Sequence, residues 1–226
     1  MGCGNVKPNS QPSHRSENKA MAKTKLYYFN GRGIGETIRL VFVQAGEPFD
    51  DIRIEQSDWP AHKPNMPLGQ MPVLEIDGVK IPQSLPIARY LARKFHLAGK
   101  DELEQLKVDV CVHTIADYRQ RYIQHILAQP DPELKAEGRK TMVNEELPKF
   151  LPFIDKLLSM WSPEGPFFLG SEITWADLIC FDFMQSMFEL DPTIGERFPR
   201  IEQHYNAVKK QPRIAAYLKV RPKTDF

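Results

Sequence analysis

The stretch LYYFNGRGIGETIRLVFVQAGEPFDDIRI, residues 26–54, decides how this chain folds. It begins with a short aromatic strand, passes through a turn rich in glycine, and continues with apolar residues at helical spacing. Gly46 and Pro48 supply the stop signals expected at the end of a helix, and residues 49–54 then alternate between apolar and charged side chains. The stretch therefore predicts a βαβ unit, whose crossover is expected to be right-handed.

The sequence that follows predicts a hairpin and a second helix. A polar loop rich in proline, residues 55–70, separates the βαβ unit from a third strand. Asp77-Gly78 is a two-residue turn of the kind that joins antiparallel strands, and it leads into a fourth strand and then an amphipathic helix. Residues 25–101 are therefore predicted to form an α/β domain with the element order βαβ-ββα.

Helical spacing dominates the second half of the chain. Apolar stripes cover residues 103–129, 133–159, 175–190 and 198–218. No strand pattern recurs among them, so we predict an all-α helical bundle over residues 102–226. Thr174 and Asp177 fit a capping box with a hydrophobic staple, which assigns them a role in folding and not in an active site.

Composition and charge argue against several classes of function. The 30 basic and 29 acidic residues leave a formal charge of +1, which argues against a surface built for nucleic acid. Cys3, Cys111 and Cys180 are odd in number and form neither a CxxC motif nor a zinc pattern, which favours a reduced intracellular compartment. The sequence has no apolar run long enough to span a bilayer and no signal peptide, so we expect a cytoplasmic protein.

Residues 1–24 form a polar leader that we expect to be disordered. They contain almost no apolar side chains, so burial would not compensate for the entropy lost on ordering. The leader begins with Met1-Gly2-Cys3, and acylation of Gly2 with palmitoylation of Cys3 would supply the two lipid groups that stable anchoring needs. Val6 stands where this motif expects Ser or Thr, and an unmodified tail is the alternative. We therefore expect membrane contact only if Gly2 and Cys3 are lipidated.

Tyr28 is the first candidate for a functional side chain. It lies at the C-terminal end of the first strand, where α/β folds usually bind ligands, and its hydroxyl can donate to an anion. Alternation along the strand predicts that Tyr27 and Phe29 pack while Tyr28 faces out. A core tyrosine is the other interpretation of the same pattern.

Two further motifs have both an ordinary and a functional interpretation. Met71-Pro72 opens the third strand, where the proline is either an ordinary trans edge residue or a cis residue demanded by local geometry. Gln83-Ser84 precedes an apolar helix, so Ser84 is predicted to be its N-cap. Donors at a helix N-terminus also form an anion site, so a cap does not exclude a second role.

Several separated motifs resemble the cytosolic glutathione S-transferases of the sigma class. They are YFNGRG at 28–33, Glu36, Arg39, IEQSDWP at 54–60, Met71-Pro72, QSLPIARYL at 83–91 and RPKT at 221–224. Motifs in the correct order are a more specific signal than any one of them, and the likeness covers residues 25–226. The resemblance implies a thioredoxin-like N-terminal domain followed by an all-helical C-terminal domain.

The resemblance also implies a site for glutathione as co-substrate, with no metal required. Tyr28 would hydrogen-bond the glutathione sulfur, and Met71, before a cis Pro72, would offer its backbone to the cysteinyl part. The other residues implied are Phe29 and Gln70, Trp59 and Lys63 at the glycyl end, Gln83 and Ser84 at the γ-glutamyl carboxylate, and Asp117. Asp117 would reach the partner's ligand across the interface of a homodimer.

Departures from the sigma class bear on the substrate. Ile34 occupies a position where an arginine often lies close to the thiolate. His113 and Ala116 replace two members of an acidic cluster on the helix of Asp117, so we expect no effect of a divalent metal. The residues that the resemblance places at the mouth of the second-substrate cleft are Arg119, Arg121 and Tyr122.

We expect a glutathione transferase that conjugates the glutathione thiolate, stabilised by Tyr28, to hydrophobic electrophiles. One alternative is a glutathione-dependent prostaglandin D synthase, which isomerises an endoperoxide. The other is a noncatalytic ligand-binding protein of the crystallin type, which only Ile34 favours. The sequence does not define the electrophile, because the second site consists of variable side chains and a fold does not fix a function.

Overall fold

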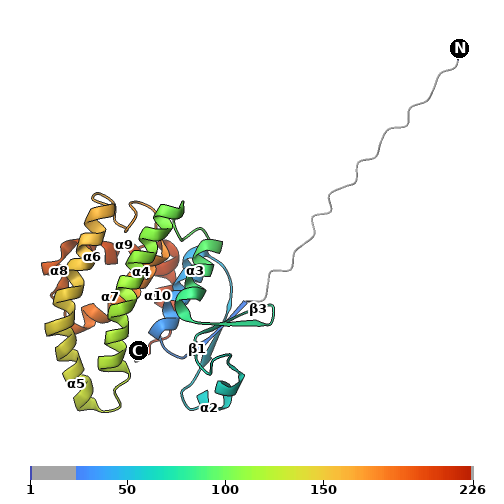
Figure 1. Cartoon of the computed structure of the whole chain (residues 1–226), viewed down its shortest axis with the longest axis horizontal. Helices are drawn as coiled ribbons and strands as arrows, with labels where there is room; N and C mark the ends of the chain where they lie inside the picture. The colour runs from blue at the N-terminus through green and yellow to red at the C-terminus, as the bar shows by residue number, and fades with distance from the viewer. Residues whose placement is uncertain (2–23, 225–226) are drawn as a thin grey trace.

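The computed structural model describes residues 1 and 24–224, which form a small sheet beside a group of helices (Figure 1). The sheet has the strand order β2-β1-β3-β4. Its strands are β1 (Thr24–Phe29), β2 (Asp50–Ile54), β3 (Val73–Ile76) and β4 (Val79–Pro82). β1 is parallel to β2 and antiparallel to β3, and β3 is antiparallel to β4. The predicted βαβ unit and hairpin are therefore confirmed, although β1 begins inside the segment predicted to be a leader.

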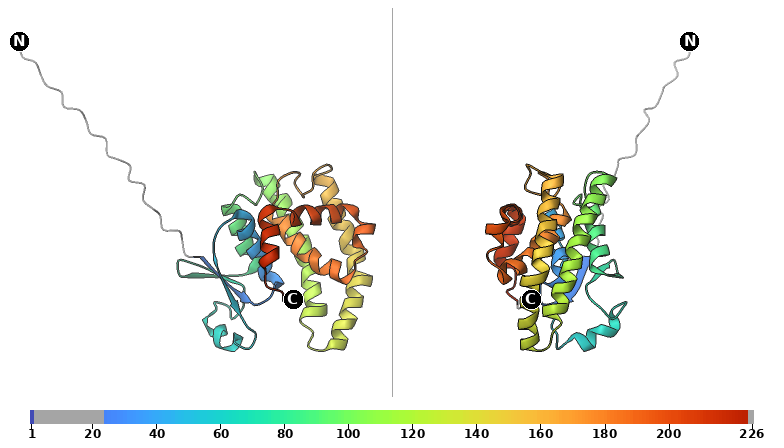
Figure 2. Two further views of the ribbon diagram at one scale, coloured as in Figure 1. Left: turned by 180° about the vertical axis from the view of Figure 1, so that it is seen from behind. Right: turned by 60° about the vertical axis from the view of Figure 1, so that its left-hand side comes forward.

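Helices α1 (Glu36–Ala45) and α3 (Ser84–Lys94) lie between the sheet and the helical half of the chain (Figures 1 and 2). A single turn, η1 (Gly33–Gly35), leads from β1 into α1. The hairpin turn between β3 and β4 is confirmed, because Asp77 has a φ of 48° and Gly78 one of 85°. Two successive left-handed residues are what a tight two-residue hairpin turn requires.

The loop over residues 55–70 contains two short elements that the sequence pattern does not predict. They are α2 (Trp59–His62) and the single turn η2 (Lys63–Asn65). Each has a proline in its first turn. N–H groups there make no hydrogen bond within the helix, so the missing N–H of proline costs nothing. Elements of one turn are too short for apolar periodicity to reveal.

The second half of the described chain is helical. Its elements are α4 (Glu102–Tyr122), η3 (Ile123–Leu127), α5 (Pro132–Thr141), η4 (Met142–Glu146), α6 (Leu147–Trp161), α7 (Trp175–Leu190), α8 (Ile194–Arg197), α9 (Pro199–Lys209) and α10 (Pro212–Val220). The π-helical turn η3 extends α4, and η4 joins α5 to α6, so the first two predicted stripes are helical. The third stripe, 175–190, is helix α7. The fourth stripe, 198–218, is divided between two helices, α9 and α10, because Pro212 lacks an N–H and begins a helix without continuing one. The domain boundary at residue 101 stays a prediction.

Helix α7 is the central helix of this half. Its first residue, Trp175, is fully buried, and the helix packs against α1, α4 and α9. The predicted capping box is confirmed, because the Thr174 N–H donates to the Asp177 carboxylate at 2.7 Å and the reciprocal bond is present. Asp177 also accepts the Phe168 N–H at 2.9 Å and lies 3.0 Å from His204 Nε2. Its carboxylate is therefore fully engaged in holding the helix start.

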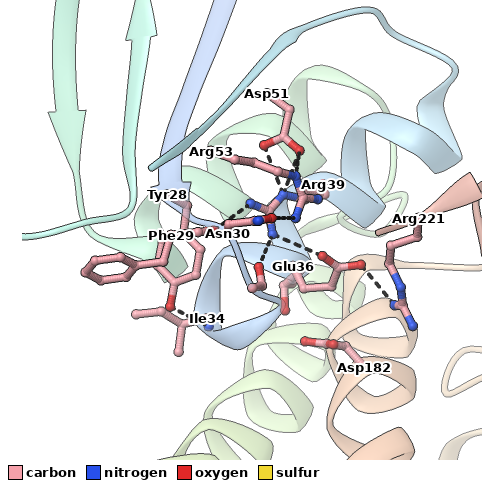
Figure 3. A network of polar contacts seen from close by, with 12 residues as sticks. Tyr28, Phe29, Asn30, Ile34, Glu36, Arg39, Asp51, Arg53, Asp182 and Arg221 are labelled. Atoms are coloured by element: carbon pink, nitrogen blue, oxygen red, sulfur yellow. Dashed lines mark hydrogen bonds and ion pairs between the residues drawn. The ribbon is translucent and has the colours of Figure 1, made fainter. Parts of the chain in front are cut away.

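A buried ion pair at the start of α1 joins distant parts of the chain (Figure 3). Arg39 and Glu36 are both fully buried, and Arg39 Nη1 lies 3.2 Å from Glu36 Oε2. Arg39 also pairs with the Asp51 carboxylate of β2 at 3.0 Å. On the other side, Glu36 Oε1 accepts from Tyr217 Oη and from Arg221 Nη1, each at 3.0 Å. This one pair therefore connects β2, α1 and the C-terminal end of the described chain.

Gly2 and Cys3, where lipidation is one of two alternatives, lie outside the described residues. Within residues 24–224, no helix has the length and apolar character needed to cross a membrane. Cys111 and Cys180 are buried free thiols, and burial raises the pKa of both. Both thiols should therefore remain protonated and unreactive in the folded protein.

Replacing Arg39 by leucine tests how far the fold depends on the buried pair. The Arg39→Leu variant leaves Glu36 and Asp51 without their shared cation, and removing one partner of a buried pair costs about 3–5 kcal/mol. We expect the urea midpoint of unfolding to fall accordingly. Lys140→Leu is the matched control, because Lys140 and Glu137 form a mostly exposed pair of the kind that contributes little. Equal losses in the two variants would contradict this role for Arg39.

Candidate active site

Tyr28 lies at the end of β1 with its ring buried against the turn that follows. Its exposed fraction is 7%. A Cβ on Gly35 would come within 2.5 Å of the ring, and one on Gly33 would overlap the hydroxyl. The predicted alternation is confirmed, but its predicted direction is wrong, because Tyr28 is on the buried face while Tyr27 and Phe29 are only half-buried. The reason is that α1 and the helical half cover the Tyr28 face of the sheet more completely than the other face is covered.

The hydroxyl of Tyr28 accepts one hydrogen bond and retains its own proton. The Ile34 N–H donates to Tyr28 Oη at 3.1 Å (Figure 3). Burial raises the pKa of Tyr28 above its ordinary value of about 10, and the Ile34 amide and the Arg39 guanidinium oppose this only in part. At neutral pH the phenol is therefore uncharged, and its O–H is available to donate to a ligand.

Two further aromatic rings lie next to Tyr28. The ring centroids of Tyr28 and Phe29 are 5.7 Å apart, and those of Phe29 and Trp59 are 5.5 Å apart, both pairs edge to face. Such pairs favour a fixed geometry. The first turn of α2 therefore brings Trp59 close to the end of β1. Lys63 and Gln70 lie on the same loop, and both side chains are exposed.

The segment before β3 contains the cis proline that the resemblance implies. The Met71-Pro72 peptide bond is cis. Met71 is almost fully buried, and it packs in one cluster with Tyr28, Val73 and Ile54. The cis bond therefore lies beside the strand that carries Tyr28.

The start of α3 differs from its prediction. Gln83 precedes the helix and has a φ of 82°, a left-handed value that is uncommon outside glycine. Ser84 is the first helical residue, so the predicted N-cap role of Ser84 is wrong. Gln83 makes no capping hydrogen bond, which leaves N–H groups of the first turn of α3 without a side-chain partner. A strained residue beside free helix N–H groups is typical of a ligand-binding site.

Two clefts share Ile34 as a wall residue. The larger, of about 600 Å³, is lined by Tyr28, Ile34 and Tyr122 together with the segment from η3 to α5. The smaller, of about 280 Å³, is lined by Ile34, Gln83 and Ser84 and by residues of α4. The expected residues Tyr28, Gln83 and Ser84 are therefore brought to adjoining clefts between the sheet and the helical half.

Arg119 is buried at the contact between the two halves of the chain. Its exposed fraction is 8%, and its guanidinium binds Asp182 at 2.6 Å and Thr37 Oγ1 at 3.0 Å. Burial raises the pKa of Asp182, and the charge of Arg119 opposes this shift. The residue therefore ties α4 to α1 and α7, and it also lines the smaller cleft beside Ile34.

Arg121 lines neither of the two clefts described above, contrary to the expectation that it would lie beside Arg119 and Tyr122. It pairs with Glu146 at 2.5 Å and lines a separate cleft of about 580 Å³ between α4 and α6. Residues two apart on a helix do not share a face, so Arg119 and Arg121 cannot both face the sheet. Asp117 lines the same outer cleft, so its implied contact with a partner's ligand stays a prediction.

Comparison with known families agrees with this architecture. Residues 24–93 match the family model "Glutathione S-transferase, N-terminal domain", and residues 116–221 match the model for the C-terminal domain. The chain belongs to the glutathione S-transferase family. The implied family is therefore confirmed, along with its thioredoxin-like and helical halves.

Curated relatives of this transferase carry three different names. A glutathione S-transferase of Anopheles gambiae is 37% identical over 206 residues, which are 91% of this chain and the whole relative. Hematopoietic prostaglandin D synthase of Rattus norvegicus has the same identity and coverage. A solved structure of the rat protein complexed with a quinoline has a TM-score of 0.83 at 36% identity, covering 90% of this chain and all of that chain. S-crystallin 4 of Enteroctopus dofleini is 33% identical over 215 residues, which are 91% of this chain and the whole relative.

Several features of the transferase site were not assigned a role from sequence. They are the close approach of Gly33 and Gly35 to Tyr28, the bond from the Ile34 amide, and the buried charges of Glu36 and Arg39. The available signal was the placement of two opposite charges three residues apart on a mostly apolar helix. Among residues 24–224, no group of three or more side chains is placed to hold a metal ion.

Gly33→Ala tests whether the turn sets the position of the Tyr28 hydroxyl. An added Cβ would overlap Oη, and a misplacement of about 1 Å can cost roughly a hundredfold in rate. We expect at least a tenfold loss in the rate of glutathione conjugation. Gly78→Ala is the control, because Gly78 also has a positive φ but open space around it. A Gly33→Ala enzyme as active as the Gly78→Ala enzyme would show that the turn does not position the hydroxyl.

Proposed function

We propose that this transferase conjugates the thiolate of glutathione to hydrophobic electrophiles, and that Tyr28 stabilises the thiolate. The observation that carries this proposal is the buried, protonated phenol of Tyr28 at the wall of the 600 Å³ cleft. Its oxygen already accepts the Ile34 N–H, so its O–H is the group left to donate to sulfur.

The size of this interaction is adequate for the role. A hydrogen bond to a charged group contributes about 1.5–3 kcal/mol, which corresponds to roughly one to two pKa units. A free thiol with a pKa of about 8.5 is only about 3% ionised at neutral pH. Lowering the pKa by one to two units makes about a quarter to three quarters of the bound glutathione thiolate. With an aryl halide, the sulfur forms a bond to the ring carbon and the halide leaves with its electron pair.

The remaining expected residues would hold the body of glutathione. The Met71 backbone, before cis Pro72 and in the same cluster as Tyr28, would bind the cysteinyl part of glutathione. The free N–H groups at Ser84, with Gln83, would bind the γ-glutamyl carboxylate. The other residues proposed for this site are Phe29, Trp59, Lys63 and Gln70.

Two other functions have support from named relatives. Isomerisation of a prostaglandin endoperoxide would use the same thiolate, and the rat relative at 37% identity is named a prostaglandin D synthase. A noncatalytic role of the crystallin type is favoured by the octopus relative at 33% identity and by Ile34. An intact Tyr28 phenol favours an enzyme over a crystallin, since a noncatalytic protein has no need of a hydrogen-bond donor that stabilises a thiolate.

We also propose that the protein works in the cytoplasm. Its buried thiols, Cys111 and Cys180, are unpaired, as expected in a reducing compartment. Lipidation at Gly2 and Cys3 would instead attach the protein to a membrane. The mass of the N-terminal peptide from the native protein distinguishes a lipidated from an unmodified N-terminus.

A homodimer is proposed on the outer face formed by α4 and α6, which lie side by side (Figures 1 and 2). The exposed apolar side chains on these two helices are Leu103, Leu106, Val110, Phe153 and Met160. Asp117 lines the cleft between the helices together with Phe153 and Met160. A second copy covering this face would bury the apolar side chains and bring Asp117 near the partner's glutathione site.

A charge placed in this apolar face tests the dimer. We expect Leu106→Glu to convert the sedimenting species from dimer to monomer, because a buried unpaired carboxylate is strongly unfavourable. Leu134→Glu is the control, since Leu134 is also exposed but lies on α5, outside the proposed interface. A wild-type chain that sediments as a monomer would rule out the dimer.

Tyr28→Phe tests the catalytic proposal. Loss of the hydrogen bond to the thiolate should reduce the conjugation rate with an aryl halide by about 8- to 25-fold at neutral pH, because the ionised fraction of the bound thiol falls back to about 3%. The pH at which the rate reaches half its maximum should move upward by roughly one to two units, because the bound thiol regains its ordinary pKa. Binding of glutathione, measured by calorimetry, should persist.

Tyr27→Phe provides the matched control for this experiment. Tyr27 is the neighbouring residue on β1, and its hydroxyl donates to Glu75 at 3.1 Å on the other face of the sheet. Its rate and pH profile should remain those of the wild type. If both wild type and Tyr28→Phe bind glutathione and neither turns over an electrophile or peroxide, the noncatalytic alternative replaces the enzyme.

A further inference from the structure

The cleft beside Tyr28 has an apolar wall and a cationic end. The wall is formed by Ile34 together with Tyr122, Ile123 and Leu127 at the end of α4 and in η3. Lys135 and Arg139 of α5 line the same cleft. Its volume of about 600 Å³ lies within the usual range for small-molecule sites, about 300–1,000 Å³.

Helix α5 is held so that both cations remain beside this wall. Lys135 and Arg139 are four residues apart and therefore share a helical face. Gly138 is on the same side of α5, and a Cβ there would overlap the backbone of His125 in η3. This close contact fixes α5 against the segment that supplies the apolar wall. The two cations are consequently positioned by packing and not only by their own flexible side chains.

The charge of this pair is not neutralised within residues 24–224. No ion pair joins Lys135 or Arg139 to a described carboxylate, whereas Lys140 on the same helix pairs with Glu137 at 3.2 Å. The nearby Asp131 caps α5 instead, accepting the N–H of Glu133 at 2.7 Å. No aspartate or glutamate is among the described residues that line the cleft. An anion at this end would therefore meet two cations and no competing carboxylate.

We propose that the second substrate is an apolar electrophile with a carboxylate at its far end. The apolar body lies along the η3 wall, the carboxylate pairs with Lys135 and Arg139, and the reactive carbon lies toward Tyr28. This inference rests on the proposed function for the identity of the reaction, but the preference for an anionic amphiphile is a property of the cleft alone. A fatty-acid-like electrophile has this distribution of charge.

Binding of a medium-chain fatty acid and of its methyl ester tests the proposal without catalysis. Both ligands are titrated calorimetrically into the full-length protein with glutathione in excess, so that the carboxylates of glutathione cannot account for the result. We expect the acid to bind more tightly than the ester, with a preference that weakens as salt is added. Equal affinities of the two ligands, or no binding of either, would overturn the proposal.

Two double variants that remove the same charge test whether Lys135 and Arg139 cause the preference for the acid over the ester. In Lys135→Gln/Arg139→Gln, the affinity for the acid should fall about five- to thirtyfold, as expected for two partly exposed charge pairs, while that for the ester changes little. Lys140→Gln/Lys149→Gln removes the same charge from residues that do not line the cleft, and it should leave both affinities unchanged. Equal losses in the two double variants would overturn the proposal. An acid preference in a protein that conjugates no electrophile would support the carboxylate site of this cleft while rejecting the proposed reaction and the role of its ligand as a substrate.

Discussion

The buried pair of Arg39 and Glu36 is the constraint on which the geometry of the site depends. Arg39 donates to the Gly31 carbonyl at 2.6 Å and to the Phe29 carbonyl at 3.3 Å, so it holds the beginning of the turn that follows β1. That turn carries the Ile34 amide to the Tyr28 hydroxyl. A buried ion pair is weak support for stability as such, because desolvation offsets much of its attraction. Its contribution here is to specify one conformation of the turn.

The same pair makes the site depend on both halves of the chain. Glu36 is held from the far side by Tyr217 and Arg221, and Arg221 also donates to Gln185 Oε1 of α7 at 3.0 Å. Arg119 adds a second connection, from α4 to α1 and α7. The two clefts that share Ile34 are lined by residues from both halves, so a fixed relation between the halves is what gives these two clefts their shape.

The sequence predicted the parts of this structure that local chemistry determines. Apolar periodicity located α7, and the Asp77-Gly78 turn followed from the need for two left-handed residues. The family resemblance, and not periodicity, predicted the cis bond at Pro72. The buried face of Tyr28 was not predicted, because alternation gives two faces without saying which one the helices cover. The N-cap of α3 was predicted one residue too late, at Ser84, because the left-handed backbone of Gln83 is not evident from the sequence.

Ile34 shows why a substitution within a family motif need not remove the function of its position. The resemblance implies a cation there, whose charge would favour a thiolate, and isoleucine supplies none. Its backbone N–H nevertheless bonds Tyr28 Oη, and a phenol that accepts a hydrogen bond becomes a better donor through its own proton. Its side chain also lines both clefts, where it adds apolar surface in place of a charge. The change therefore keeps the polarisation of Tyr28 while making the adjoining space more favourable to an apolar electrophile.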